Sequence, residues 1–243
     1  MNKILCIIQA RMGSTRLPGK VLKEVNGRPM LAYQIARLNH QFPDLDIMLA
    51  TTSMAADDAL ESFCLNNNIQ YYRGSENDVL GRFADIITQN AHTDTDRIIR
   101  ITGDCPLICP DLIRALIDEY HRSGAHYGRI DTDTYPRGVD AEIFTVGMLI
   151  TANNKAASDY EREHVTPYFY QTDTQYKVLK LKNSSGDHHE YRLCVDELLD
   201  FEVFQRIIEI LGDSWRSATY DDLITLLQRN PDLSKHNQHV QQR

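Results

Sequence analysis

The segment from Gln9 to Lys20 concentrates groups that bind anions, and it reads Q-A-R-M-G-S-T-R-L-P-G-K. It contains two glycines and three cations, Arg11, Arg16 and Lys20. Backbone N–H groups in such a turn form an anion-binding concavity, and the cations add positive charge for phosphate groups. The apolar run at 4–8 precedes the segment and is typical of a buried strand. The pattern predicts a polyphosphate site at the carboxyl end of a first parallel strand, where open α/β sheets bind ligands.

Two familiar phosphate-binding patterns do not fit this segment. The Walker motif has four residues between its glycines and a Ser or Thr after its Lys. Here five residues separate Gly13 from Gly19, and Val21 follows Lys20. The dinucleotide pattern G-x-G-x-x-G is also absent. A surface loop with solvated cations is the alternative, but glycines, a proline and cations in one turn after a buried strand favour a binding site.

Two aspartates follow apolar runs farther along the chain. Asp104 comes after the run at 97–102, and Asp196 comes after the run at 191–195. Side chains at the ends of parallel strands project at the ligand edge of the sheet. Mg²⁺ is commonly held by one or two carboxylates together with substrate phosphates. The alternative for both residues is a helix cap or a turn former, which are common roles of aspartate.

Apolar runs of strand length alternate with segments of helical periodicity in the first half of the chain. This rhythm predicts an α/β fold, a Rossmann-like, mostly parallel sheet flanked by helices. The expected strands lie at 4–8, 47–50, 69–72 and 97–102, with helices near 30–38, 55–65, 78–87 and 110–120. After Ser123 we expect strands at 125–130, 139–146, 176–182 and 191–195, and helices at 147–155, 199–211 and 220–228. We therefore predict one domain over 1–233, with a small β-rich arm at about 125–190, and a polar tail at 234–243 that frays.

The composition narrows the class of protein. A chain of 243 residues with a formal net charge of −8 and a pI near 5.6 lacks the basic character of most nucleic-acid-binding proteins. Five cysteines, an odd number that includes several in apolar runs, indicate reduced thiols and a cytoplasmic location. We expect neither a membrane span nor a signal peptide, because the apolar runs are too short.

Several motifs, in order along most of the chain, resemble the cytidylyltransferases that make CMP-activated acidic sugars. The resemblance is closest to the SpsF-like branch, named for spore-coat polysaccharide synthesis. The two longest similar segments are A-R-M-G-S-T-R-L-P-G-K at 10–20 and R-I-T-G-D-C-P-L-I at 100–108. Further ones are R-G-S-E-N-D-V-L at 73–80, Y-P-R-G-V-D-A-E at 135–142, E-R-E-H-V-T-P-Y at 161–168 and V-D at 195–196.

The resemblance implies a fold of the nucleotide-diphospho-sugar transferase or GT-A type. It implies CMP transfer from CTP to an acidic sugar, with Mg²⁺ held by Asp104 and Asp196 and catalytic roles for Arg11, Lys20 and Asp104. The nucleotide-binding residues it implies are Ala10, Arg11, Gly13, Ser14, Lys20, Ser75, Asp78 and Arg82. It places acceptor recognition on Arg137, Asp140, Glu142, Arg162 and His164, and it implies a homodimer.

Several alternatives remain open at this stage. Arg82 could be a solvated helix residue, the 135–142 segment could be an exposed charged strand, and Arg162 and His164 could form a dimer contact. After Asp196 the family usually continues T-P-E-D-L-E, whereas this chain has E-L-L-D-F-E, so the turn has lost its proline. A metal role for the His188-His189-Glu190 run lacks further ligands in the sequence.

Two rival functions are also compatible with parts of the sequence. A glycosyltransferase would use an Asp-x-Asp string for its metal, and Asp94-Thr95-Asp96 and Asp131-Thr132-Asp133 both match that short pattern. A non-catalytic nucleotide-sugar binder would bind CTP without turnover. The acceptor sugar, the base preference and the general base do not follow from the sequence.

Overall fold

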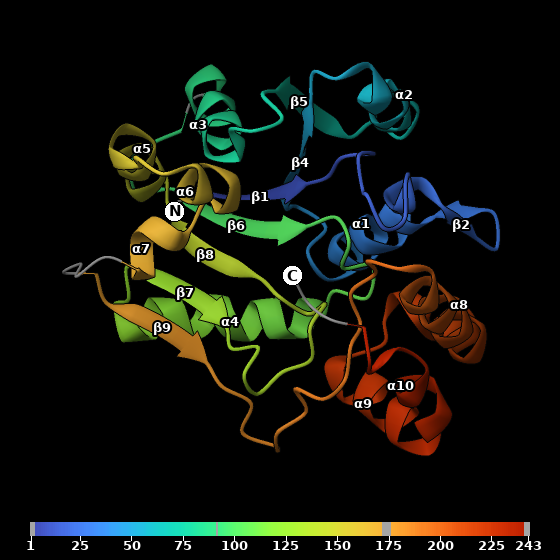
Figure 1. Ribbon diagram of the computed structural model, residues 1–243. Helices are drawn as coiled ribbons and strands as arrows, with labels where there is room; N and C mark the ends of the chain where they lie inside the picture. The colour runs from blue at the N-terminus through green and yellow to red at the C-terminus, as the bar shows by residue number, and fades with distance from the viewer. Residues whose placement is uncertain (1–2, 91, 172–175, 241–243) are drawn as a thin grey trace.

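The computed structural model describes residues 3–90, 92–171 and 176–240, and within them a seven-stranded sheet organises the chain (Figure 1). The strand order is β5-β4-β1-β6-β8-β7-β9. Neighbouring strands are parallel except at β8, which is antiparallel to both β6 and β7. The strands are β1 (Ile4–Gln9), β4 (Asp46–Thr52), β5 (Gln70–Gly74), β6 (Arg97–Thr102), β7 (Tyr127–Ile130), β8 (Glu142–Thr145) and β9 (Val178–Leu181). The mostly parallel, Rossmann-like sheet flanked by helices is confirmed.

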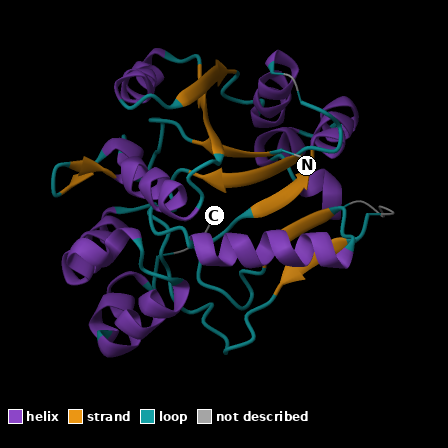
Figure 2. Cartoon of the chain, turned by 180° about the vertical axis from the view of Figure 1, so that it is seen from behind, coloured by secondary structure: helices purple, strands orange, loops and turns teal. Residues whose placement is uncertain are grey.

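Helices cover both faces of this sheet, because its central strands are apolar on both sides. In β1, Cys6 and Ile8 join one buried cluster while Leu5 and Ile7 join the other. The first cluster includes residues of α1 (Met30–Gln41), α2 (Asp58–Asn66), α4 (Pro110–Ser123), α8 (Leu198–Leu211), α9 (Tyr220–Arg229) and α10 (Pro231–Asn237). The second includes residues of α3 (Val79–Gln89), α5 (Val146–Lys155) and α7 (Pro167–Tyr170). Figure 2, seen from behind, shows α4 lying across the strands on the first face.

Local sequence signals explain where several of these helices begin. The Asp78 side chain accepts a hydrogen bond from the Gly81 N–H at 2.8 Å and caps α3. Ser158 and Glu161 form a reciprocal capping box at the start of α6 (Asp159–His164). Short 3-10 helices lie at η1 (Lys20–Leu22), η2 (Ala55–Asp57) and η3 (Gly212–Arg216).

The segment at 125–190 contributes β7, β8 and β9, and these three strands extend the main sheet at one edge. A separate two-stranded antiparallel sheet pairs β2 (Glu24–Val25) with β3 (Arg28–Pro29) around the Asn26-Gly27 turn. Figure 1 shows this small sheet projecting from the α1 side of the molecule.

Two expectations about secondary structure are wrong. Within the described residues, the run at 191–195 forms no strand and makes a single bridge, between Arg192 and Arg137, because its N–H groups bond to loops. The Leu193 N–H donates to the Arg137 carbonyl at 2.7 Å, and the Val195 N–H donates to the Asp104 carbonyl at 2.8 Å. The second wrong expectation is fraying from 234 onward: α10 continues through Asn237, and Asn237 and Val240 are buried. Residues 241–243 of the predicted tail lie outside the described residues.

Candidate functional site

The loop after β1 turns back toward the sheet and buries its lysine. Gly19 adopts a left-handed conformation, with φ of 69°, directly before η1, and such a turn favours glycine. The turn directs Lys20 inward, where it is only 8% exposed. The buried Asp57 carboxylate fixes the outer part of the loop by accepting from the Met12 N–H at 2.7 Å and from the Thr52 N–H at 3.1 Å. The loop is therefore anchored to β4 before any ligand binds.

Lys20 brings the two predicted aspartates together. Its Nζ lies 3.2 Å from Asp104 Oδ2 and 2.9 Å from Asp196 Oδ1, and it also donates to the Val195 carbonyl at 2.7 Å. Burial disfavours the charged amine, but the two carboxylates outweigh this effect and raise the pKa of Lys20. Asp104 lies 84 positions from Lys20 in the sequence and Asp196 lies 176 positions from it, yet both carboxylates converge on one ammonium group.

Asp196 is surrounded by cations. Its Oδ2 lies 3.1 Å from Arg16 Nη2 and 2.6 Å from Arg192 Nη2, while its Oδ1 faces Lys20. Burial opposes ionisation of Asp196, but these cations prevail and lower its pKa. Arg192 in turn pairs with the fully buried Asp200 at 2.9 Å. Asp196 is therefore an ionised carboxylate held from three sides, although its turn lacks the family's proline.

This loop and the ends of β1 and β6 enclose a cleft of about 710 Å³. Of the residues predicted to bind the nucleotide, the cleft is lined by Ala10, Arg11, Gly13, Ser14, Lys20 and Arg82, together with Asp104 and Asp196. The Arg11 guanidinium is half exposed and pairs with Glu76 at 2.9 Å. Arg82 is buried and donates to the Ser75 carbonyl at 2.8 Å, so it is not a solvated helix residue. Burial and the nearby Arg11 lower the pKa of Arg82.

Two of the predicted nucleotide-binding residues do not line the cleft. The Ser75 hydroxyl accepts from the Asp78 N–H at 3.2 Å, and the Asp78 carboxylate caps α3. Both side chains are used to shape the start of that helix. Their neighbours Glu76 and Asn77 line the cleft instead. The segment is an irregular loop without a repeating pattern, so the sequence could not show which of its side chains face the cleft.

A second pocket of about 290 Å³ adjoins the cleft and shares Thr102, Asp104 and His164 with it. Arg137, Asp140 and Glu142, three of the predicted acceptor residues, line this pocket. His164 therefore lies between the two spaces, and its ring packs 4.4 Å from the ring of Tyr160. Gly138, with φ of 103°, lets residues 137–141 cross close to Leu193 and Cys194, since a Cβ there would lie 2.2 Å from the Cys194 nitrogen.

The two carboxylates of the second pocket differ in their bonding. Glu142 accepts from Thr166 Oγ1 at 2.7 Å and also bonds to Arg100 and to the Tyr127 hydroxyl. Asp140 accepts from the Gly138 N–H at 3.1 Å through Oδ2, but its buried Oδ1 has no partner among the described residues. Burial raises the pKa of Asp140 to about 6, although the Gly138 N–H and Arg137 favour its ionised form. Glu142 organises the pocket wall, whereas Asp140 still offers an acceptor.

Arg162 does not line either space, contrary to the prediction from the sequence. Its guanidinium donates to Asn153 Oδ1 and to the Asn153 carbonyl, both at 2.7 Å, and contacts the Asp78 carboxylate at 3.4 Å. The last turn of α5 leaves carbonyl groups without helical partners, and an arginine is well suited to satisfy them. Arg162 therefore ties α6 to α5 and α3.

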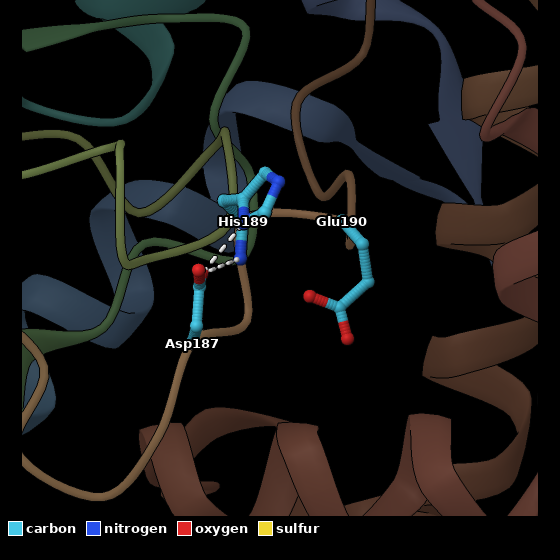
Figure 3. Close-up of side chains that lie close together, drawn as sticks. All are labelled: Asp187, His189 and Glu190. Carbon is cyan, nitrogen blue, oxygen red and sulfur yellow. Dashed lines mark hydrogen bonds and ion pairs between the residues drawn. The ribbon is translucent and has the colours of Figure 1, made fainter.

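The Asp-x-Asp strings and the histidine run also lie elsewhere. Asp94 and Asp96 precede β6, at the opposite end of that strand from the cleft, and Asp131 and Asp133 line neither space. Asp187, His189 and Glu190 gather within 4.8 Å of one another (Figure 3), and all three are exposed. The His189 ring pairs with Asp187 at 2.6 Å, and none of the three lines either space.

Three residues contribute to the site in ways that the sequence does not reveal. Arg16 adds charge to the first loop, as predicted, and it also binds Asp196 and Glu197 directly. Arg129 and Tyr170 line the second pocket, and the Arg129 guanidinium lies over the Tyr170 ring, 5.4 Å from its centroid. Only strand pairing brings Arg129 to the pocket, and register was not predictable from the local pattern.

A cationic loop at the carboxyl end of β1, with two carboxylates converging beside it, lies at the edge where open α/β sheets bind ligands. Comparison with known proteins agrees: the cytidylyltransferase family model matches residues 5–234, so the chain belongs to the cytidylyltransferase family.

Similarity to individual relatives extends over the full chain. The spore coat polysaccharide biosynthesis protein SpsF of Bacillus subtilis is 35% identical over 240 residues, covering 96% of this chain and 98% of the relative. The structure of a cytidylyltransferase from Leptospira borgpetersenii matches with a TM-score of 0.88 and 30% identity, and both chains are covered in full. An 8-amino-3,8-dideoxy-manno-octulosonate cytidylyltransferase of Shewanella piezotolerans is 33% identical over 131 residues, about half of each chain. Among the described helices, none has the length and apolar character needed to cross a membrane.

Proposed function

We propose that this protein transfers CMP from CTP to an acidic sugar of the ulosonic or nonulosonic type and releases pyrophosphate, for the synthesis of a surface polysaccharide or glycan. The observation that carries the proposal is the convergence of Lys20, Asp104 and Asp196 where a cationic cleft meets a second, smaller pocket. The larger cleft is the proposed CTP site, and the smaller pocket is the proposed acceptor site.

The first loop supplies the groups for the nucleotide. Ala10, Gly13 and Ser14 present a backbone that can approach the base and the phosphates, and Arg11 and Lys20 neutralise phosphate charge. Arg82 adds a buried cation at the far wall of the cleft. Ser75 and Asp78 act indirectly in this proposal, because they fix the start of the helix that carries Arg82.

Asp104 and Asp196 are the proposed ligands of Mg²⁺. Their carboxylate oxygens approach one point closely enough to share the Lys20 ammonium, and an all-oxygen donor set fits this ion. When bound, Mg²⁺ would supply polarisation of the phosphate oxygens and charge neutralisation. Because Asp196 already contacts Arg16 and Arg192, Asp104 is the less constrained of the two ligands.

The remaining residues position the reaction. A hydroxyl of the sugar in the second pocket attacks the α-phosphorus in line, and pyrophosphate leaves toward the first loop. Arg11 and Lys20 stabilise the departing charge, and such positioning and charge neutralisation account for most of the acceleration in phosphoryl chemistry. Asp140 accepts a hydrogen bond from the acceptor, Arg137 adds a cation at the mouth, Glu142 holds the wall in place, and His164 separates the two spaces.

The experiment that tests this function combines each of the four nucleoside triphosphates with a panel of acidic sugars and measures pyrophosphate release with Mg²⁺ and with chelator. We expect release with CTP and one class of acidic sugar, and only when Mg²⁺ is present. A glycosyltransferase would release no pyrophosphate from CTP under any condition. A non-catalytic binder would bind CTP with or without Mg²⁺ and turn over with no acceptor.

We further propose that the enzyme works in the cytoplasm as a homodimer. All five cysteines are free and buried, as suits a reducing compartment. The segment at 161–168, which resembles the family's dimer-contacting segment, carries His164 at the boundary of the two spaces. Sedimentation equilibrium of the full chain tests the dimer directly.

A further inference from the structure

The second pocket has a floor of charged side chains that is set by strand register. Glu142 on β8 lies opposite Arg100 on β6 and opposite Arg129 on β7. Directly opposed residues project from the same face of a sheet, so Arg100, Glu142 and Arg129 form a row with one carboxylate between two guanidinium groups. All three line the second pocket. The row therefore carries an excess of positive charge facing the acceptor.

The two arginines of this row are not equivalent. Arg100 is already used, because its Nε donates to Gln9 Oε1 at 3.0 Å and its Nη1 pairs with Glu142. Glu142 accepts hydrogen bonds from Arg100, Tyr127 and Thr166, and among the described ion pairs none joins it to Arg129. The buried Nε of Arg129 has no hydrogen-bond partner among the described residues.

Arg129 is nevertheless held in place. Its guanidinium lies over the ring of Tyr170, 5.4 Å from the centroid, and both residues line the pocket. Stacking on an aromatic ring restrains a guanidinium while leaving the donors at its edge available. A buried donor without a partner costs free energy. The unpartnered Nε therefore marks a guanidinium that the described part of the fold does not hold through this donor.

We propose that Arg129 binds the carboxylate of the acceptor sugar, an assignment that rests on the proposed function. A carboxylate matches the fork of a guanidinium with two parallel hydrogen bonds, and a pocket wall provides the low dielectric that strengthens them. Arg137, the other arginine that the resemblance placed in acceptor recognition and that lines this pocket, is exposed at the pocket mouth. Arg129 thus determines that the acceptor is an acid.

The test measures calorimetric binding of 3-deoxy-manno-octulosonate and of its neutral methyl ester, with CMP present, to the full chain and to Arg129→Gln. We expect the wild-type protein to bind the acid roughly 10- to 100-fold more tightly than the ester, and Arg129→Gln to bind the two alike. Arg129→Lys, which keeps the charge without the fork, should retain part of the preference. The CTP affinity of Arg129→Gln reports whether that variant folds. If it does not fold, Arg129→Lys provides the test.

The matched control is Lys180→Gln, which removes a cation opposite Arg129 on β9 that pairs with Asp133 and lies outside the pocket. Its preference for the acid should equal that of the wild type. A preference that survives in Arg129→Gln, or a wild-type protein that binds both probes equally or neither, overturns the assignment. Pyrophosphate release from CTP with a neutral sugar would then leave nucleotidyl transfer standing while rejecting an acidic acceptor.

Discussion

The two spaces that meet at Asp104 satisfy their charges in opposite ways. On the nucleotide side, Lys20 and Asp196 are buried within a network of ion pairs that includes Arg16 and Arg192. On the acceptor side, Asp140 Oδ1 and Arg129 Nε are buried without partners among the described residues. Around Lys20 and Asp196 the charges are balanced before a ligand arrives, and the group on that side without a partner among the described residues is the buried Arg82 Nε. The acceptor side instead leaves both a donor and an acceptor without partners.

This difference between the two sides affects how strongly each should discriminate among ligands. If the first cleft binds a triphosphate as proposed, the ligand exchanges existing ion pairs for new ones, so its net binding free energy is a small difference between large interactions. An acceptor in the second pocket supplies hydrogen bonds to groups that otherwise have none. A molecule without the matching groups leaves buried polar atoms unpaired and is rejected strongly. The second pocket is therefore where selection among sugars should be strongest.

The largest effect on stability is expected from removing a cation of the ion-pair network on the nucleotide side. Arg192→Met leaves the buried Asp200 and Asp196 without their shared cation, and Asp200 retains only neutral donors such as Asn237. Removing one partner of a buried pair typically costs about 3–5 kcal/mol. Urea unfolding at pH 7 should show a loss of stability of that order.

The matched control is Arg122→Met, since Arg122 also pairs with a carboxylate but is largely exposed. We expect a change of less than about 1 kcal/mol there. If the two variants lost similar stability, the ion pairs around Asp196 would be no more important than a surface contact, and the contrast between the two sides would fail.

The second prediction concerns catalysis on the same side. Lys20→Ala and Asp104→Ala should each reduce turnover by at least ~100-fold, as the loss of a charge-stabilising group does. Pyrophosphate release at saturating CTP measures the effect, and the folded state of each variant is checked by its unfolding transition. Unchanged rates in both variants would remove the catalytic assignment.

These residues were predictable because each stands in a short linear pattern. Lys20 and Asp104 follow the apolar strands β1 and β6, and the ends of parallel strands share one edge of the sheet. The same rule predicted that Asp196 lies at this edge, and it does, although no strand directly precedes it in the described part of the chain. The run at 191–195 is buried at that edge without forming a strand, since its backbone bonds to Arg137 and Asp104.

Residues whose roles depend on pairing across the sheet could not be predicted. Arg129 reaches the pocket only because it lies opposite Glu142, and Glu142 is used internally only because Arg100 lies on its other side. A shift of one residue would turn each side chain to the opposite face. Likewise, α10 looked like a polar tail because Asn237, which donates to Asp200 at 2.9 Å, is polar and buried.

The third prediction concerns Asp140, in the second pocket. Asp140→Asn should stabilise the protein at pH 7 by on the order of 1–3 kcal/mol, because the buried carboxylate is then replaced by a neutral group. The same variant should bind the acceptor more weakly, by about 10-fold, since the amide matches the acceptor's hydrogen bonds poorly. Urea unfolding and the acceptor KM measure the two effects.

The pH dependence of this gain follows from the raised pKa of Asp140. Burial raises the pKa from 3.8 to about 6, so the native state binds the additional proton between these values, and the wild-type protein loses stability as pH rises through this window. The gain from Asn should therefore be present above about pH 6 and vanish below about pH 4. A gain that is independent of pH would contradict this account. Asp213→Asn, at an exposed position in η3, is the control and should show no gain.

The smallest effect on function is expected at Arg162, which the sequence placed with Arg137 in the acceptor site. Because Arg162 donates to Asn153 and lies outside both spaces, Arg162→Met should lower stability by about 1–2 kcal/mol and change the acceptor KM by less than about threefold. Arg137→Met, at the pocket mouth, should show the reverse, a raised KM with little loss of stability. An Arg162→Met protein of unchanged stability and tenfold higher KM would mean that the acceptor reaches α6, so that the unsatisfied side of the site extends beyond the second pocket.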